Sequence, residues 1–388
     1  MESKPKLIVC LSRFPFPLDK GDKLRAYHQI KDLSTNFDIY LICTTDCKTK
    51  EKYRNEIAIF CKEIHVFELK KWKIYLQLLI TIFTNKPFQV AYFYQFSIQN
   101  KINHLLYRIK PNHIYSQLIR SSEYVKNYHE CSKTLDYMDT FSKGIERRMI
   151  SKKGILKWIF QQEYQRLSNY ERQIFEYFEH HTIISEQDRS YISHPRQKEI
   201  TIIKNGVDAH FSPSENSPKS IDLLFTGNMG YPPNVEAANF IYHSILPKLS
   251  RTTNCLIAGV NPPNSLQKLS NNQFKITGWV SDMRDCYAIS KVFIAPMFIG
   301  TGLQNKLLEA MAMGIPCITT SLANKALGAT PDKEILIANN ADEFITQYKR
   351  LLEDSYLYTQ LVKNGKEYVL LHFSWSQCNK TLTNLIVS

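Results

Sequence analysis

The chain has little that would carry it across or out of a membrane. Residues 76–83 form an apolar stretch that is far shorter than the roughly 20 residues of a spanning helix. The first residues, MESKPKLIVCLSRFPFP, contain an apolar run that is too short for a secretion signal and that merges into a strand-turn pattern. We therefore expect a cytoplasmic protein.

Metal-ligand and nucleophile patterns are also missing. The nine cysteines are scattered, odd in number and often placed inside apolar runs such as LIVCL, which predicts reduced, buried thiols. Cys43 and Cys47 are four residues apart, but no second Cys/His pair has zinc-ligand spacing. The eleven histidines are dispersed, and no Ser-His-Asp or Cys-His spacing is present. The sequence predicts neither a metal site nor a hydrolase triad.

Positive charge is abundant. There are 49 Lys and Arg against 36 Asp and Glu, a formal net charge of +13, which favours anionic partners. No zinc-finger, RRM or KH pattern accompanies the charge, so we do not expect nucleic acid as a partner. Basic and aromatic residues occur together in residues 70–86 and 143–166, as in helices that lie on a lipid surface. Core helices with solvated basic faces would give the same composition.

Length and periodicity predict two α/β domains. A chain of 388 residues exceeds the usual single core. A strand over residues 6–11, a helix from about Asp22 and a strand over 38–44 give a βαβ opening, and further strands are expected at 63–68, 113–116, 133–137 and 181–185. The pattern restarts with strands at 222–226, 255–260, 274–280 and 292–296. The expected fold is two Rossmann-like doubly wound domains.

The stretch PMFIGTGLQNKLLEAMAMGIPCITT, residues 296–320, predicts a glycine-rich turn, a helix over 303–313 and a buried strand. Gly300 and Gly302 flank Thr301 in a turn that lets the backbone approach a ligand. Free amides over residues 300–304 and the positive end of the helix dipole favour an anion there. Gly314, followed by a proline two residues later, ends the helix.

Two charged side chains follow that turn on one helix face. Lys306 would add a full positive charge to the anion site. Glu309 lies three residues after Lys306 and seven after Gly302, so the three share roughly one face. A carboxylate at this position could accept hydrogen bonds from ribose hydroxyls. A strand, tight turn and helix also occur in any doubly wound domain, which is the purely structural alternative.

The segment EAMAMGIP, which begins at Glu309, resembles the donor-site motif of retaining glycosyltransferases of the two-Rossmann type, GT-B, and in particular the large family numbered four. The family pattern is Glu, seven residues, Glu, then Ala-Met and Gly-x-Pro. Thr301 holds the position of the first Glu in this chain. A branch with Gly-x-Gly and a Lys three residues before the retained Glu, which includes enzymes of polysaccharide export clusters, is more similar. The segment NGVD, from Asn205, resembles the hinge into the second domain of these enzymes.

The resemblance implies two domains that face a central cleft, with the donor held by the second. In the family the retained Glu binds the ribose and loop amides bind the diphosphate. Many members have Arg at the position of Asn228, so Lys306 is expected to supply that charge. The implied donor-side residues are Gly227, Asn228, Val280, Gly300, Thr301, Gly302, Leu303, Asn305, Lys306 and Glu309, and those implied for catalysis are Thr301, Lys306 and Glu309.

The first domain, residues 1–204, is expected to bind the acceptor, the second to span 205–371, and a final helix over 372–388 to cross back onto the first. The loop after the first strand would place four residues at the acceptor or donor phosphate: Lys20, Gly21, Asp22 and Arg25. Arg120 and Asp139 end two further strands and complete the acceptor set. Asp22 could instead cap a helix, and Asp139 could be a turn or cap residue.

The expected reaction moves a sugar from a nucleoside-diphosphate sugar to an acceptor hydroxyl with retention, without a metal or a permanently bound cofactor. Amides and positive charge would stabilise the departing diphosphate. No residue stands out as a general base. The expected acceptor is a glycan or lipid-linked saccharide in cell-surface polysaccharide synthesis, with peripheral contact to the anionic inner membrane. A nucleotide-sugar 2-epimerase and a noncatalytic nucleotide-sugar-binding subunit are the alternatives.

Overall fold

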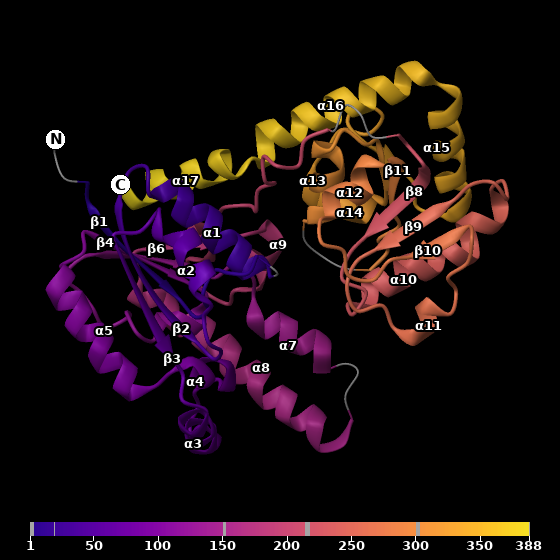
Figure 1. Ribbon diagram of the computed structural model, residues 1–388. Helices are drawn as coiled ribbons and strands as arrows, with labels where there is room; N and C mark the ends of the chain where they lie inside the picture. The colour runs from indigo at the N-terminus through magenta and orange to yellow at the C-terminus, as the bar shows by residue number, and fades with distance from the viewer. Residues whose placement is uncertain (1–3, 19, 150–152, 214–217, 300–302, 388) are drawn as a thin grey trace. The chain divides into compact units, whose positions relative to one another are not determined.

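The computed structural model describes residues 4–18, 20–149, 153–213, 218–299 and 303–387. The chain divides into two compact units. The first comprises Met1–Lys204 and Cys378–Ser388, and the second comprises Asn205–Gln377. Figure 1 shows a β-sheet with surrounding helices in each unit.

The first unit contains a parallel sheet of seven strands in the order β3-β2-β1-β4-β5-β6-β7. The central strand β1 pairs with β2 from Lys6↔Asp38 onward and with β4 from Leu7↔His113 onward. The seven strands are β1 Lys6–Leu11, β2 Asp38–Thr45, β3 Glu63–Glu68, β4 His113–Gln117, β5 Ser132–Asp136, β6 His180–Ile183 and β7 Thr201–Ile202.

Helices cover both faces of this sheet because its strands are apolar on both faces. Leu7, Val9 and Leu11 of β1 belong to one buried cluster, which also contains side chains of α1, α2 and α17. Ile8 and Cys10 point the other way, into a cluster with α5 and α8. The helices of this unit are α1 Gly21–Leu33, α2 Glu51–Ala58, α3 Lys71–Ile82, α4 Phe88–Phe93, α5 Phe96–Ile109, α6 Ile119–Ser122, α7 Phe141–Met149, α8 Gly154–Ile174 and α9 Glu186–Tyr191.

The second unit contains a parallel six-stranded sheet in the order β10-β9-β8-β11-β12-β13. The order reverses beside β8, and in such sheets ligands bind at this point, outside the carboxyl ends of the strands. The strands are β8 Ile221–Thr226, β9 Cys255–Ala258, β10 Phe274–Ile276, β11 Ser290–Ala295, β12 Cys317–Thr319 and β13 Leu336–Ile337. The helices are α10 Pro232–Phe240, α11 Asn264–Gln267, α12 Met283–Ala288, α13 Asn305–Ala312, α14 Ser321–Leu327, α15 Ala341–Glu353 and α16 Ser355–Phe373.

The last helix, α17 (Trp375–Val387), begins in the second unit, and its residues from Cys378 onward belong to the first. Its Asn379 side chain donates to the Asp32 carboxylate of α1 at 2.6 Å. Nearby in the second unit, Gly206 lies so close to Trp375 that a Cβ atom would sit 2.5 Å from the Trp375 nitrogen. Side chains are therefore excluded at Gly206.

The two parallel sheets with helices on their faces confirm the α/β prediction. The expected strands all form, most of them within two residues of the predicted ends. Among the described residues, no helix is long and apolar enough to cross a membrane.

Candidate active site

Helix α13 carries the charged residues that the sequence singled out. Its apolar positions are buried, including Leu307, Leu308 and Met311, and these fix the helix against the sheet. The polar positions Lys306 and Glu309 are consequently left half-buried on the remaining face. Asn305 begins the helix, and Gly314 adopts φ 68° just after its end, a conformation that favours glycine.

The Lys306 ammonium lies beside the end of strand β8. Its Nζ atom donates to Asn234 Oδ1 at 2.5 Å and lies 4.6 Å from the centre of the Phe225 ring. A Cβ atom built on Gly227 would be 3.3 Å from this nitrogen. Among the described residues, Asn234 supplies the only oxygen that accepts from Lys306, although an ammonium has three donors. The amine therefore retains hydrogen-bonding capacity next to the β8 loop.

Glu309 is held from behind by a tyrosine. The Tyr287 hydroxyl of α12 donates to Glu309 Oε2 at 2.8 Å and lies 2.8 Å from Thr226 Oγ1. Tyr287 is fully buried, so this contact fixes one carboxylate oxygen. The other oxygen accepts no hydrogen bond from the described residues and can receive a ligand.

Burial shifts the pKa of both charged groups toward neutrality. It lowers the pKa of Lys306 to about 7, an effect that the Glu309 carboxylate partly opposes. Burial also raises the pKa of Glu309 to about 7, against the Tyr287 hydrogen bond and the Lys306 charge. Such shifts cluster at functional sites, because a buried charge without a full set of partners is costly. A bound anion would restore the ordinary charge of Lys306.

Glycines bring the backbone close together at the ends of neighbouring strands. A Cβ atom on Gly259, after β9, would lie 1.8 Å from the carbonyl oxygen of Gly227, after β8. The Gly259 amide donates to the Gly278 carbonyl at 3.1 Å. Because none of these positions carries a side chain, the backbone segments after β8, β9 and β10 approach one another closely, and the segment after β8 lies beside Lys306.

The predicted donor residues fall into three groups. The structure places Gly227, Lys306 and Glu309 together, with Asn305 and the half-buried Leu303 at the start of the same helix segment. Gly300, Thr301 and Gly302 lie outside the described residues. Exposed Asn228 follows Gly227 in the chain and accepts from the Gly230 amide at 2.9 Å, and half-buried Val280 packs against the core of the second unit.

Asn234, Tyr287 and Gly259 were not predicted. Asn234 bridges the site, since it accepts from Lys306 and donates to the Asn228 carbonyl at 2.9 Å. A buried polar residue in the first turn of the helix after β8 was the available signal for Asn234. Nothing in the sequence indicates that the Tyr287 side chain reaches Glu309.

In the first unit the structure corrects the prediction for Arg25. We expected its side chain at a ligand-binding surface, but it is fully buried and pairs with Asp136, Nε to Oδ2, at 2.6 Å. It also donates to the Ile203 carbonyl at 2.9 Å. Tyr115 donates to the same Asp136 oxygen at 2.6 Å. Arg25 therefore joins α1 to β4, β5 and the end of β7 and is not available to a ligand.

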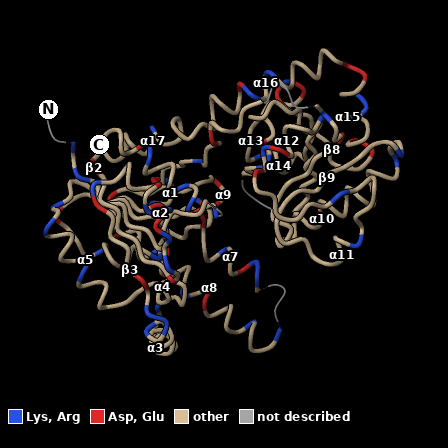
Figure 2. Tube along the Cα trace, viewed as in Figure 1, with Lys and Arg blue, Asp and Glu red and all other residues tan. Residues whose placement is uncertain are grey.

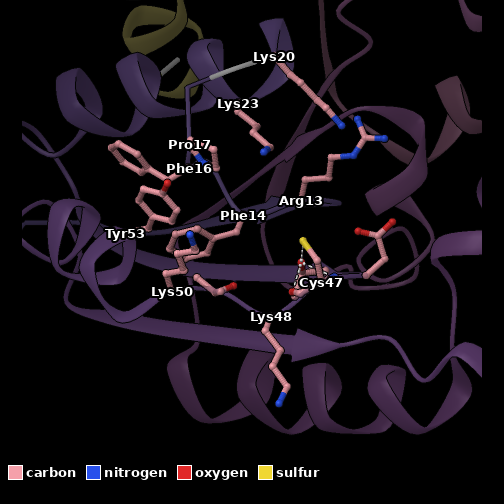
Figure 3. Close-up of a pocket in the computed structure, with 13 residues that line it drawn as sticks. Arg13, Phe14, Phe16, Pro17, Lys20, Lys23, Cys47, Lys48, Lys50 and Tyr53 are labelled. Carbon is pink, nitrogen blue, oxygen red and sulfur yellow. Dashed lines mark hydrogen bonds between the residues drawn. The ribbon is translucent and has the colours of Figure 1, made fainter. Parts of the chain in front are cut away.

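Lys20 lines a cavity of about 260 Å³ in the first unit (Figure 3). Five basic residues contribute to its lining, against the single carboxylate of Asp46. Figure 3 shows the ends of Arg13, Lys20 and Lys23 turned toward one part of the cavity, whereas Lys48 points away from them. The basic lining residues are Arg13, Lys20, Lys23, Lys48 and Lys50. Only Lys20 among them was predicted.

Gly21 begins α1 with open space around its Cα atom. Asp22 accepts from Arg13 at 2.9 Å, and α1 has no side-chain cap hydrogen bond at Lys20. Asp22 therefore does not cap α1 and instead forms an ion pair with Arg13.

Arg120 and Asp139 lie near Asp22. The Arg120 guanidinium stacks 4.5 Å from the centre of the Phe141 ring, and its Nε atom is buried without a hydrogen-bond partner among the described residues. Burial and the nearby Arg13 lower the pKa of Arg120 to about 10. Asp139 is exposed to solvent as a whole residue. Desolvation of its carboxyl group and the nearby Asp188 charge raise its pKa to about 6. An anion beside Arg120 would satisfy a buried donor.

Metal-ligand geometry is not found in the described part of the chain. No group of three or more His, Cys, Asp or Glu side chains among those residues is placed to hold a metal ion.

The chain is similar to known glycosyltransferases in sequence and in structure. Residues 220–354 match a family model described as glycosyl transferases group 1. An uncharacterized 44.6 kDa protein in the cps region of Klebsiella pneumoniae is 22% identical over 405 residues, with 96% of each chain covered. Sucrose-phosphate synthase from Thermosynechococcus elongatus has a TM-score of 0.67 at 14% identity, with 98% of each chain covered. HepE of Anabaena, in complex with UDP-glucose, has a TM-score of 0.69 at 10% identity, with 98% of this chain and 99% of that chain covered.

The structural matches extend over both units and give the chain the GT-B fold, as predicted. The family match falls on the unit that holds Lys306 and Glu309. The chain is a GT-B glycosyltransferase, and the predicted enzyme class is confirmed.

Proposed function

We propose that this enzyme transfers a sugar from a nucleoside-diphosphate sugar to a hydroxyl of a glycan or lipid-linked acceptor, with retention of the anomeric configuration. One observation carries the proposal. A desolvated lysine and a carboxylate lie one turn apart on α13, and the lysine amine is beside Gly227 at the carboxyl end of β8. This is where a doubly wound sheet binds nucleotides.

The two side chains suit different parts of such a donor. Lys306 would contact the diphosphate and stabilise the negative charge that develops as the sugar leaves. Glu309, oriented by Tyr287, would accept hydrogen bonds from the ribose. The resemblance to retaining enzymes supports a front-face reaction in which the donor's own phosphate oxygen takes the acceptor proton. Thr301, proposed to stand where relatives have a Glu, lies outside the described residues.

The first unit supports an acceptor that carries negative charge. The basic cavity around Lys20 and the unpartnered Nε atom of Arg120 both favour an anionic group. A lipid-linked saccharide carries its sugar on a phosphate or diphosphate. We propose that Lys20 and Arg120, with Gly21, Asp22 and Asp139 around them, hold the acceptor.

Synthesis of a cell-surface polysaccharide is the proposed setting. It is supported by the relative from the cps region and by the resemblance to enzymes of polysaccharide export clusters. We place the enzyme in the cytoplasm, at the inner face of the membrane.

A binding panel tests the donor class first. We expect one nucleotide among UDP, GDP, ADP and CMP, or one of their sugars, to raise the thermal unfolding midpoint of the wild type and not of Glu309→Ala. Transfer of labelled sugar, with the product's anomeric configuration read by NMR, then tests retention. Release of free nucleotide and altered sugar without an acceptor would instead indicate the epimerase. A bound donor that never turns over would indicate a noncatalytic subunit.

The pKa values of Lys306 and Glu309 predict a bell-shaped pH dependence of donor binding. Above pH 7 the free enzyme loses the Lys306 proton, which bound diphosphate requires, so affinity falls as pH rises. Below pH 7 Glu309 becomes protonated and is no longer a charged acceptor for the ribose hydroxyls, so affinity falls as pH falls. Each limb should approach about tenfold per pH unit.

Isothermal titration calorimetry with the nucleotide sugar measures this dependence, since its esterified diphosphate does not titrate in this range. Glu309→Gln should flatten the acid limb only, and Lys306→Gln the alkaline limb only. An affinity that is constant from pH 6 to pH 9 in the wild type would refute the assignment of both groups to the donor.

A further inference from the structure

We propose that the outer face of α3 and the first turns of α8 form a docking surface for an anionic lipid bilayer. The inference deepens the proposed function, because an enzyme with a lipid-linked acceptor works at a membrane. The surface consists of residues 70–83 and 153–159. It rests on exposed side chains, on their helical spacing and on charge.

Helix α3 exposes its more apolar face. Its outward side chains recur at intervals of three and four residues, so they form a single stripe. Ile74 and Thr81 are buried on the opposite face. A helix on the surface of a soluble domain normally shows the reverse arrangement. The outward residues are 49% to 89% exposed and are Trp72, Tyr75, Leu76, Leu79, Ile80, Ile82 and Phe83.

The start of α8 continues the same composition. Four apolar side chains within its first six residues are 40% to 74% exposed, namely Ile155, Leu156, Trp158 and Ile159. Arg166, further along α8, donates to the carbonyls of Thr81 and Ile82 at 2.9 Å and 3.2 Å. Arg166 follows Ile159 by seven residues, roughly 10 Å along a helix. Helix α8 therefore passes the end of α3, and both exposed segments lie near the bottom of Figure 1.

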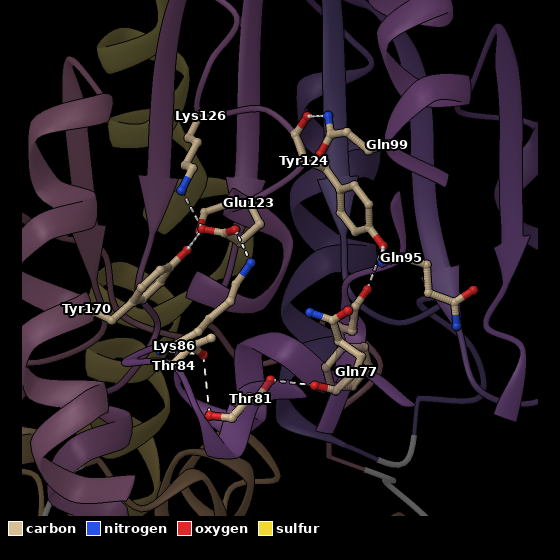
Figure 4. Close-up of polar contacts among 12 residues, drawn as sticks. Gln77, Thr81, Thr84, Lys86, Gln95, Gln99, Glu123, Tyr124, Lys126 and Tyr170 are labelled. Carbon is tan, nitrogen blue, oxygen red and sulfur yellow. Dashed lines mark hydrogen bonds and ion pairs between the residues drawn. The ribbon is translucent and has the colours of Figure 1, made fainter. Parts of the chain in front are cut away.

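Polar contacts hold the end of α3 in place. Lys86 pairs with Glu123, which also accepts from Lys126 at 2.7 Å and from the Tyr170 hydroxyl at 2.8 Å (Figure 4). Glu123 is buried, so the segment after α3 is tied to α8 from within. The apolar stripe is therefore fixed toward solvent by the fold.

The positive charge of both segments favours an anionic lipid bilayer as the partner of this surface. Residues 70–86 contain four lysines and no acidic residue, and residues 147–162 contain five basic residues and no acidic one. Figure 2 shows blue and no red along α3. Exposed Lys70 and Lys71 flank the apolar stripe, as in helices that lie at an anionic lipid surface. Two tryptophans lie within the surface, and this residue favours the membrane interface.

Vesicle sedimentation of the full chain tests this proposal without donor or acceptor. We expect binding to vesicles of phosphatidylglycerol and phosphatidylethanolamine, with at least about tenfold weaker binding to phosphatidylcholine alone or at high salt. The triple variant Leu76→Gln, Leu79→Gln, Phe83→Gln should lose at least about tenfold in affinity for the anionic vesicles. Its circular dichroism and thermal midpoint should stay near those of the wild type, because the replaced side chains are exposed.

A matched control lies in the second unit. Leu352, Tyr356 and Leu371 of α15 and α16 are 57% to 74% exposed, and their triple replacement by glutamine should leave vesicle binding unchanged. Fluorescence gives a second readout, since brominated lipids should quench Trp72 and Trp158 but not Trp279.

Equal loss in both triple variants, or no binding of the wild type to anionic vesicles, would overturn the proposal. So would a dimer in solution that the α3 variant converts to a monomer, because the face would then be an interface between copies of the chain. Failure of vesicle binding alone leaves the sugar-transfer proposal intact, since donor turnover with a soluble acceptor is measured separately.

Discussion

Replacing Lys306 with methionine is expected to lower sugar transfer by about 10²- to 10³-fold while the protein stays folded. The variant removes the ammonium that lies beside Gly227 and keeps most of the side-chain volume. Burial already lowers the pKa of Lys306 to about 7, so the charged form of this side chain destabilises the enzyme when no ligand is bound. We therefore expect the thermal midpoint without ligand to be unchanged or raised, as at other sites where function opposes stability.

Initial rates with the donor identified by the binding panel measure the loss, and differential scanning calorimetry measures the midpoint. Lys349→Met, at an exposed position of α15, is the matched control and should change neither. A folded Lys306→Met enzyme with the turnover of the wild type would show that the diphosphate is bound elsewhere.

Arg25→Met should destabilise the first unit by about 3–5 kcal/mol, because it leaves the buried Asp136 carboxylate without its cation. Both side chains of this pair have no exposed surface. Urea unfolding followed by far-UV circular dichroism measures the effect. Adding Asp136→Leu to the same chain should recover part of the loss, since two apolar side chains replace the pair.

The control for Arg25 is a pair nearer the surface. Arg13 and Asp22 bind each other at 2.9 Å with side chains 28% and 13% exposed, and Arg13→Met should cost less than about 1 kcal/mol. If Arg25→Met instead kept its stability and lost activity, Arg25 would have the ligand-binding role that its sequence position first indicated.

The position of Arg25 shortly after β1 did not predict the direction of its side chain. Being near the start of a helix after a strand predicts where the backbone lies. Whether the side chain turns to solvent or into the sheet depends on what faces it from other strands. Asp136 and Tyr115 come from β5 and β4, and no local pattern in residues 20–25 reports them.

The sequence by itself determined the strand positions, the doubly wound class and the Lys306–Glu309 pair. Apolar runs of strand length predict buried parallel strands, and helical spacing alone places two side chains three residues apart on one face. These are local properties, so the chain reveals them without its partners.

Only the tertiary structure decided three other matters. Strand order brought Asn234 to Lys306 and Tyr287 to Glu309, although the chain separates the members of each pair widely. Packing buried Arg25 and turned the apolar stripe of α3 outward. Amphipathicity left that stripe open to either a core or a lipid partner, because a helical pattern marks which side chains share a face and not what the face meets.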